Sequence, residues 1–503
     1  MISSRSQSVL WGLAAVLVVG FAVTATILSL QFTYGEGHAQ RPLLLYCTVH
    51  AAGWLGMALA GWLAVRHSKG SFPLILFAGV TARCILVLSQ PMEDDSMYRY
   101  LLDGHMARAG VNPYSLSPEA VQLDPPAPLT SMINSDPAQQ IISRVAYPEM
   151  KSPHAPLAVA AFSAGSLMTP WQWHGQRIVF LLADMGTWGL ILMVLRLIER
   201  PLAWSVLYAW NPLVLKEAVN TPHPDVFAAL LIIAAILCAR RWTEHENPLW
   251  AGACGIAVAA ATLATYYPII VAPAFLAVLF RGEHRFRAVA AFVLPLAIWT
   301  AVGTIPFVQQ LGMSGMLEGL RTQTAHWRTN DGAFSFVSWL AETRAMDGLA
   351  QWSENLPIMD PGAAVMGREQ IPALARLLAL AIVALTAVGT AAMLYFFGET
   401  GDDFLWAIRS SLLVLWLMAP APFPWMAIPI LALGALSPTI SSLALSFVAI
   451  AYYALACGTY HGWTPAVSQG VKFAEHGLIW AAIAAPIVVM RRRATAPPDE
   501  PAE

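Results

Sequence analysis

The sequence predicts an all-α protein that crosses a membrane many times. Hydrophobic residues make up 57% of its 503 residues, and only 12% are charged, about half the share of an average soluble protein. The mean hydropathy is correspondingly high, at +0.58. Apolar residues in such excess need lipid as their solvent, and long apolar runs cross lipid as helices because a helix satisfies its own backbone hydrogen bonds.

Apolar segments long enough to cross a bilayer, or nearly so, occur along the whole chain. Because several are short or interrupted by proline, we expect about thirteen crossings. The segment 156–170 is ambiguous and is expected to be partly interfacial. The segments are 9–32, 43–65, 71–90, 177–195, 202–215, 225–239, 249–266, 267–280, 288–306, 370–397, 404–420, 424–437, 439–457 and 475–490.

Lysine and arginine in short loops predict the orientation, since such loops face the cytoplasm. The N-terminus is then cytoplasmic, and residues 91–155 and 307–368 form two large loops on the outer face of the inner (plasma) membrane. We expect one transmembrane domain over 1–493 and a disordered, Pro- and acid-rich tail over 494–503. The basic residues concerned are Arg66, Lys69, Arg196, Arg200, Arg240, Arg241, Arg281 to Arg287 and Arg491 to Arg493.

Composition also argues against two classes of protein. The net charge of -2 and the lack of a basic run give nucleic acid nothing to bind. The five cysteines all lie in or beside apolar stretches and none forms a C-x-x-C pair, so neither a disulfide framework nor a cysteine metal site is expected.

The first outer loop carries the acids Glu93, Asp94 and Asp95 directly after an apolar segment. If 94–106 is helical, Asp95, Arg99 and Asp103 share one face, with Asp94 and Tyr98 beside it and Met97, Leu101 and Leu102 opposite. This pattern predicts an amphipathic helix on the membrane surface. Clustered carboxylates beside an arginine suit a general base, although an acidic helix N-terminus in solvent gives the same pattern.

The residues of this loop resemble a known family signature. The run from Glu93 to Tyr114, E-D-D-S-M-Y-R-Y-L-L-D-G-H-M-A-R-A-G-V-N-P-Y, is similar to the first loop of bacterial GT-C glycosyltransferases, and most to the polyprenyl-phosphate-mannose-dependent mannosyltransferases. The segment from Trp210 to Glu217, W-N-P-L-V-L-K-E, followed by His223-Pro224-Asp225, resembles a second element of that family. Tyr266-Tyr267-Pro268 resembles a third.

The chain departs from the family pattern at several places. Leu102 replaces a tryptophan and Pro224 replaces an asparagine. One additional residue separates the acids from Tyr98, and the Y-P-P-L element is only loosely matched between Tyr147 and Leu157. These departures bear on the donor sugar and on which acid is the base.

The resemblance implies an inverting transfer of a sugar, with mannose favoured, from a polyprenyl phosphate to a hydroxyl of a glycan or glycolipid acceptor. Phosphate leaves without an acid, so one carboxylate base suffices. Asp94 is favoured over Asp95, and Glu93 follows. Cations must neutralise the departing phosphate, and the candidates are Arg99, Lys216, His326 and Arg328.

Other polar residues are candidates for binding donor or acceptor. Arg83, within an apolar segment, is expected to meet a phosphate or a carboxylate of another helix. Lys216 either binds or extends to the interface, and Glu217 need not pair with it. His223 and Asp225 orient a sugar hydroxyl or, as a weaker alternative, hold a divalent cation. The remaining candidates are Tyr98, Asp103, Asn112, Tyr114, His154 and Tyr267.

Two other classes of function fit part of the pattern. A transporter or flippase of lipid-linked sugars also has proline-broken spans and intramembrane charges, but the sequence has no internal repeat and its charges gather at one face. A polysaccharide ligase or polymerase would also use lipid-linked sugars. The Y-R-Y-L-L-D-G and W-N-P-L segments favour the transferase.

Overall fold

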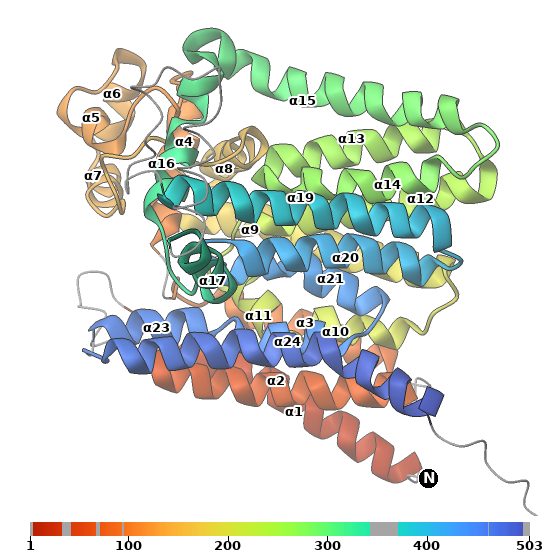
Figure 1. The fold of residues 1–503 in the computed structure, drawn as a ribbon. Helices are drawn as coiled ribbons and strands as arrows, with labels where there is room; N and C mark the ends of the chain where they lie inside the picture. Colours follow the sequence, from red (N-terminus) through yellow and green to blue (C-terminus); the bar gives the residue numbers. More distant parts are fainter. Residues whose placement is uncertain are drawn as a thin grey trace, which may run out of the picture.

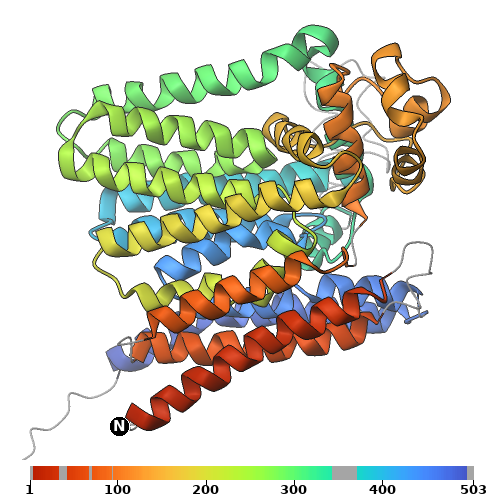
Figure 2. The same cartoon turned by 180° about the vertical axis from the view of Figure 1, so that it is seen from behind.

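The computed structural model describes residues 4–32, 42–66, 71–92, 95–342, 371–460 and 462–495. Every regular element in these ranges is a helix, as the composition predicts. The long helices run side by side, and small helices gather at one end of the bundle (Figures 1 and 2). One hydrophobic core extends from Trp11 near the N-terminus to Ile479 in the last helix.

Seven helices are long and apolar enough to cross a membrane, as expected of a multi-pass membrane protein. Their length reflects apolar runs without an internal break, except in α15, where Pro295 and Pro306 occur. They are α1 (Ser4–Ser29), α2 (Leu43–Arg66), α9 (Trp173–Leu197), α12 (Asp225–His245), α13 (Pro248–Thr265), α15 (Arg285–Met316) and α19 (Ile371–Phe397).

The remaining expected crossings fall mostly on shorter apolar helices, so the count of about thirteen is not reached. Two further helices, α20 (Gly401–Met418) and α24 (Pro465–Thr495), complete the bundle. Which of these elements traverse the bilayer, and in which direction, stays a prediction. The shorter elements are α3 (Phe72–Val87), α8 (Pro156–Met168), η4 (Tyr267–Val271) with α14 (Ala272–Leu279), η7 (Pro424–Ala427) with α21 (Ile428–Leu436), α22 (Ile440–Val448) and α23 (Ala451–Tyr460).

The expected crossing at 202–215 is a series of short pieces: η2 (Leu202–Ser205), α10 (Val206–Ala209) and α11 (Pro212–Leu215). Pro212 cannot continue the preceding helix, and Asn211 caps a new one by accepting from the backbone N–H groups of Leu213 and Val214. The ambiguous segment 156–170 forms α8, whose 13 residues extend about 20 Å, less than the bilayer core. Whether it crosses fully stays a prediction.

The first predicted outer loop folds into helices rather than remaining irregular. These are α4 (Ser96–Arg108), α5 (Pro118–Leu123), α6 (Ala127–Ile133) and α7 (Asp136–Ile142), which share a small core of their own. Leu102, at the position where the family pattern has tryptophan, lies fully buried in this core. In the second predicted loop, α15 continues to Met316, and α16 (Glu318–His326) and α17 (Gly332–Leu340) follow.

The expectation that α4 is an amphipathic helix with an open charged face is wrong, and its place relative to the membrane stays a prediction. Its charged side is covered as well as its apolar side: Arg99 is 6% exposed and Asp103 1%. α4 packs closely against α8 at Gly104, where a Cβ atom would lie 2.5 Å from the carbonyl oxygen of Phe162. The glycine of the D-G pair is therefore needed for this close approach.

Candidate functional site

A π turn follows the proline break in the W-N-P-L segment. This element, η3 (Lys216–Asn220), closes with a bond of 3.1 Å from the N–H of Thr221 to the carbonyl of Lys216. All five of its side chains are buried. Such turns place an additional residue in a helix and are frequent at functional sites.

Lys216 and Glu217 form an ion pair inside the protein, although adjacent residues of a helix need not pair. The Lys216 Nζ lies 3.3 Å from the Glu217 Oε2 and 2.5 Å from the hydroxyl of Tyr453 on α23. The same hydroxyl lies 2.9 Å from the other oxygen of Glu217. Both charged side chains have no exposed surface, so the expectation that Lys216 extends to the interface is wrong.

His223 continues this cluster toward α4. Its Nε2 lies 3.4 Å from the Glu217 Oε2, its Nδ1 lies 2.9 Å from the Tyr100 hydroxyl, and its ring stacks on Trp425 at 3.8 Å. Burial lowers the pKa of His223 well below its usual range, and Lys216 and His154 add to the effect. A neutral imidazole therefore lies between Glu217 of η3 and Tyr100 of α4.

Of the three predicted acids, only Asp95 lies within the described residues. Glu93 and Asp94 fall outside the described residues, but both of their flanks are described. The N–H of Met92 donates to the side chains of Asn220 and Thr221, each at 3.1 Å. Asp95 immediately precedes α4. Met92, on one side of Glu93 and Asp94, is therefore attached to the end of η3, and Asp95, on the other side, leads into α4.

Arg177, which the sequence reasoning missed, secures the same junction. It donates to the carbonyls of Val87 and Ser89 at the end of α3 and to that of Asn220 in η3. The side chain is 1% exposed. Its only sequence signal was an arginine at the start of the apolar segment 177–195, whereas Arg83 lies within the segment 71–90.

Arg83 has the carboxylate partner expected as one alternative. Its guanidinium contacts Asp184 of α9 through two nitrogens, at 2.5 and 3.2 Å. It also donates to the carbonyls of Gly79 and Ala209, and Tyr208 donates to Asp184 at 2.9 Å. Asp184 was not predicted from the sequence. The pair is buried and closed on itself, so Arg83 serves the packing of α3 against α9.

Arg99 and Asp103 share a helix face as predicted, and both face the segment 150–154. Arg99 donates to the carbonyls of Met150 and Lys151, and Ser152 donates to Asp103 at 2.6 Å. Burial raises the pKa of Asp103 to about 6, although Arg99 and Ser152 oppose it. Arg99 therefore fixes the end of the first predicted outer loop through these two carbonyls.

His154 contacts two tyrosines, the predicted Tyr114 and Tyr266, which precedes the predicted Tyr267. Its carbonyl accepts from the hydroxyl of Tyr114 at 2.7 Å and from that of Tyr266 at 3.1 Å. Burial lowers the pKa of the His154 ring to about 3. Asn112 accepts from the N–H of Tyr114 and donates to Gln310 of α15, so these residues of the N-P-Y element fix the loop.

Three predicted residues, Tyr98, Asp225 and Tyr267, make contacts outside the Lys216 cluster. Tyr267 donates to Asp225 at 2.8 Å and so joins η4 to the start of α12. Tyr98 faces the small core of the loop helices, where the Arg144 guanidinium lies 5.7 Å from its ring.

Arg328 and Asp331 lie between α16, α17 and α24. Arg328 and Lys472 both donate to Asp331, and the second bond measures 2.8 Å. Although burial opposes it, these bonds hold the pKa of Asp331 below its usual range. The Arg328 side chain remains 43% exposed. The side chain of His326 lies outside the described residues.

The structure thus brings Lys216, Glu217 and His223 together with Tyr100 of α4, the helix that Asp95 precedes. Within the described ranges, no group of three or more His, Cys, Asp or Glu residues could hold a metal ion. No family model, no curated protein and no solved structure matches the chain. A function therefore has to be argued from these residues and their contacts.

Proposed function

We propose that the chain is a GT-C-type membrane glycosyltransferase. It would transfer a sugar, with mannose favoured, from a polyprenyl phosphate to a hydroxyl of a glycan or glycolipid. The observation that carries the proposal is the attachment of Met92 to Asn220 and Thr221. These bonds bring together the two sequence segments that resemble the family, although more than a hundred residues separate them.

The chemistry needs one base and a positive environment for the leaving phosphate. Asp94 is the proposed base and takes the proton of the acceptor hydroxyl as its oxygen attacks the anomeric carbon. The bond from that carbon to the phosphate oxygen breaks at the same time, and phosphate leaves with its electron pair. The sugar is inverted because attack and departure occur on opposite faces.

The contacts divide the predicted cations into two groups. Lys216 is neutralised by Glu217, and Arg99 donates to two backbone carbonyls. Both cations already have partners, so neither is assigned to neutralise the negative charge that develops on the leaving phosphate. Arg328 retains an exposed edge, and it is the described cation that we assign to the donor phosphate. Lys216, Glu217 and His223 instead support the segment beside Asp94.

The rival transporter function draws on the buried charges of α3 and α9. Arg83 and Asp184 lie among apolar helices, as the charged residues of transporters do. Their polar groups, however, are matched by Tyr208 and by two backbone carbonyls. A pair closed in this way favours a role in packing over a role in carrying an ion or a sugar.

The test uses purified protein in nanodiscs with a panel of polyprenyl-phosphate sugars and, separately, nucleotide sugars. We expect release of polyprenyl phosphate, by transfer or slow hydrolysis, from at least one lipid-linked sugar, and no release of nucleotide from any nucleotide sugar. Movement of intact lipid-linked sugar across vesicle membranes, without cleavage, would support the transporter instead. Efficient transfer from a nucleotide sugar with no lipid carrier would overturn the donor assignment.

A further inference from the structure

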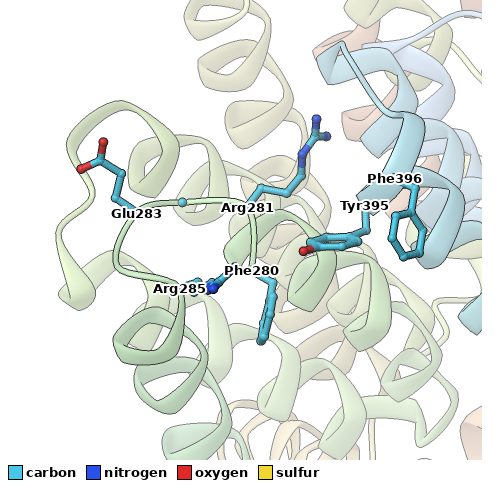
Figure 3. Close-up of a pocket in the computed structure, with 7 residues that line it drawn as sticks. Phe280, Arg281, Glu283, Arg285, Tyr395 and Phe396 are labelled. Carbon is cyan, nitrogen blue, oxygen red and sulfur yellow. The ribbon is translucent and has the colours of Figure 1, made fainter.

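A recess of about 560 Å³ opens at the end of the bundle opposite to α4–α7 (Figures 1 and 3). It lies between the turn that joins α14 to α15 and the end of α19. Its size is within the range of ordinary ligand sites. The proposed transfer chemistry makes no use of it. The lining residues are Phe280, Arg281, Gly282, Glu283, Arg285, Tyr395 and Phe396.

Two arginines give the recess its positive charge, and both are held in place. Arg281 donates to the carbonyls of Leu394 and Gly398, and so it also caps the end of α19. The guanidinium of Arg285 lies over the rings of Phe280 and Phe286, at 5.7 and 5.2 Å from their centroids. Arginine held by stacking keeps its N–H groups directed outward for an anion.

Acidic groups lie around the recess but do not cancel this charge. Glu283 is on the far side of the turn, and its carboxylate points away from the arginines and the rings (Figure 3). The Glu246 carboxylate accepts from the backbone N–H of Glu283. Asp403 caps the start of α20 by accepting from the backbone of Thr400. Within the described chain, no ion pair joins any of these acids to Arg285.

The rim of the recess is apolar and lies where two long apolar helices end. Phe286 is 70% exposed, Phe396 71% and Phe397 77%. Exposed aromatic rings at the ends of apolar helices are typical of the boundary between lipid and water. The recess therefore opens at headgroup depth, where a purely soluble ligand is not the expected occupant.

α15 provides a surface for acyl chains directly beside the arginines. Only 11% of its most apolar stretch is buried within the protein, against 33–50% for the other six long apolar helices. Its exposed apolar residues include Val293, Leu294, Ile298 and Val302. A molecule that places an anion between Arg281 and Arg285 can thus lay hydrocarbon along α15.

From this combination we propose that the recess binds the phosphate headgroup of an anionic phospholipid, with its acyl chains along α15. Charge complementarity supports the phosphate, and the aromatic rim with the exposed face of α15 supports the lipid. Arg285 is the residue that contributes most to selectivity for anionic headgroups, because Arg281 is already engaged with α19. The proposal does not depend on the transferase activity or on the orientation of the chain.

The experiment measures retained lipid on purified full-length protein. Protein is reconstituted in nanodiscs that contain equal amounts of phosphatidylglycerol and phosphatidylcholine. It is then re-extracted in mild detergent, and bound lipids are quantified by native mass spectrometry. We expect one or more phosphatidylglycerol molecules to remain preferentially bound.

Arg285→Gln tests the site, and Arg287→Gln is the matched control, since it removes the same charge two residues away and Arg287 does not line the recess. We expect Arg285→Gln to reduce retained phosphatidylglycerol by at least about tenfold, the value of one charge-assisted hydrogen bond. Arg287→Gln should change it by less than about twofold. Arg281 is left unchanged because its loss would also uncap α19.

Three outcomes would overturn the proposal. Equal losses in the two variants would show a diffuse attraction to surface charge rather than a site. Equal retention of phosphatidylcholine and phosphatidylglycerol by the unchanged protein would remove the anionic selectivity. Displacement of the lipid by millimolar glycerol phosphate, which has no acyl chains, would show that the recess recognises a soluble phosphate and not a lipid.

Discussion

Two clusters of buried charge lie in the helix bundle, and they differ in what surrounds them. The Arg83–Asp184 pair joins α3 to α9, and its polar groups are matched by Tyr208 and nearby carbonyls. The Lys216–Glu217 pair instead neighbours His223, which contacts Tyr100 of α4, the helix that follows the predicted acids in the chain. Both cost desolvation, which ion pairing alone seldom repays.

The comparison indicates how to separate packing from function. A closed pair should affect stability alone when it is broken. A chain of charged and polar groups next to a proposed base should affect turnover as well as stability. The predictions below test this division, from the largest expected effect to the smallest.

Breaking the closed pair should have the largest effect on stability. Asp184→Asn leaves the buried Arg83 charge without its carboxylate, and we expect a loss of about 3–5 kcal/mol in the free energy of unfolding. Unfolding in mixed detergent micelles measures it. Turnover per folded molecule should remain normal.

The matched control replaces both partners with apolar residues. Arg83→Met with Asp184→Leu should recover most of the lost stability, because no uncompensated charge remains.

Glu217→Gln should, in contrast, reduce turnover in the molecules that stay folded. A turnover defect in Asp184→Asn equal to that in Glu217→Gln would contradict the division between the two clusters.

The proposed base should have the largest effect on turnover. Asp94→Asn should lower single-turnover rates by at least about a hundredfold, while folding and donor affinity stay near normal. Asp95→Asn should act more through binding or stability, since Asp95 directly precedes α4. Asp124→Asn, at an exposed acid of the same loop, is the control and should remain active.

A normal rate for Asp94→Asn, with an inactive Asp95→Asn that still binds donor, would move the base to Asp95. Full activity in both variants would remove the first outer loop from the catalytic site, and the family resemblance would lose its main support.

The helical fold could be predicted because lipid imposes a local rule: apolar runs become helices. The number of crossings could not be predicted as well, because hydropathy does not reveal where proline divides an apolar run. The hydropathy of 202–215 is compatible with one continuous span and also with several short helices. Asn211 and Pro212 divide it into short helices. The covering of α4 was also missed, since residues far along the chain provide it at Ser152 and Phe162.

Sequence reasoning found both partners of some contacts, such as Tyr267 with Asp225, but only one partner of others. It identified Arg83, Lys216 and His223, but not Asp184, Tyr453 or Trp425. The missed residues are ordinary members of apolar segments, and tertiary packing alone makes them partners. Tyr100 lies inside a quoted motif and could have been selected with Tyr98. Position in the motif did not indicate which tyrosine faces the cluster.

The pH dependence of stability should reveal the buried histidine of the first loop. Burial lowers the pKa of His154 to about 3, so between that value and the unfolded value of about 6.5 only the unfolded state binds the proton. Stability therefore falls as pH decreases through this window. We expect His154 to account for a loss of about 2 kcal/mol at pH 5 relative to pH 7.

His154→Gln should reduce that acid sensitivity, and His174→Gln, at an exposed histidine, should leave it unchanged. Asp103 works in the opposite direction: its pKa is raised to about 6, so its contribution to stability is lost as pH rises from about 4 to 6. Asp103→Asn should therefore make the acid sensitivity steeper. Identical pH profiles in the wild type and His154→Gln would contradict the burial of a neutral imidazole.

The smallest effect concerns the cation assigned to the donor phosphate. Arg328 holds Asp331 together with Lys472, and it alone of the described candidate cations keeps an exposed edge. One charge-assisted bond to phosphate corresponds to roughly tenfold in affinity or more, so Arg328→Gln should raise the Kd for a lipid-phosphate sugar by about that factor.

Lys472→Gln removes the other partner of Asp331 and separates the two roles of the arginine. If Lys472→Gln weakens donor binding as much as Arg328→Gln does, the ion pair is structural. If Lys472→Gln leaves the Kd within about twofold while Arg328→Gln raises it, the arginine contacts the phosphate directly. The positive charge that neutralises the leaving group then comes from the second predicted outer loop and not from the buried Lys216 cluster.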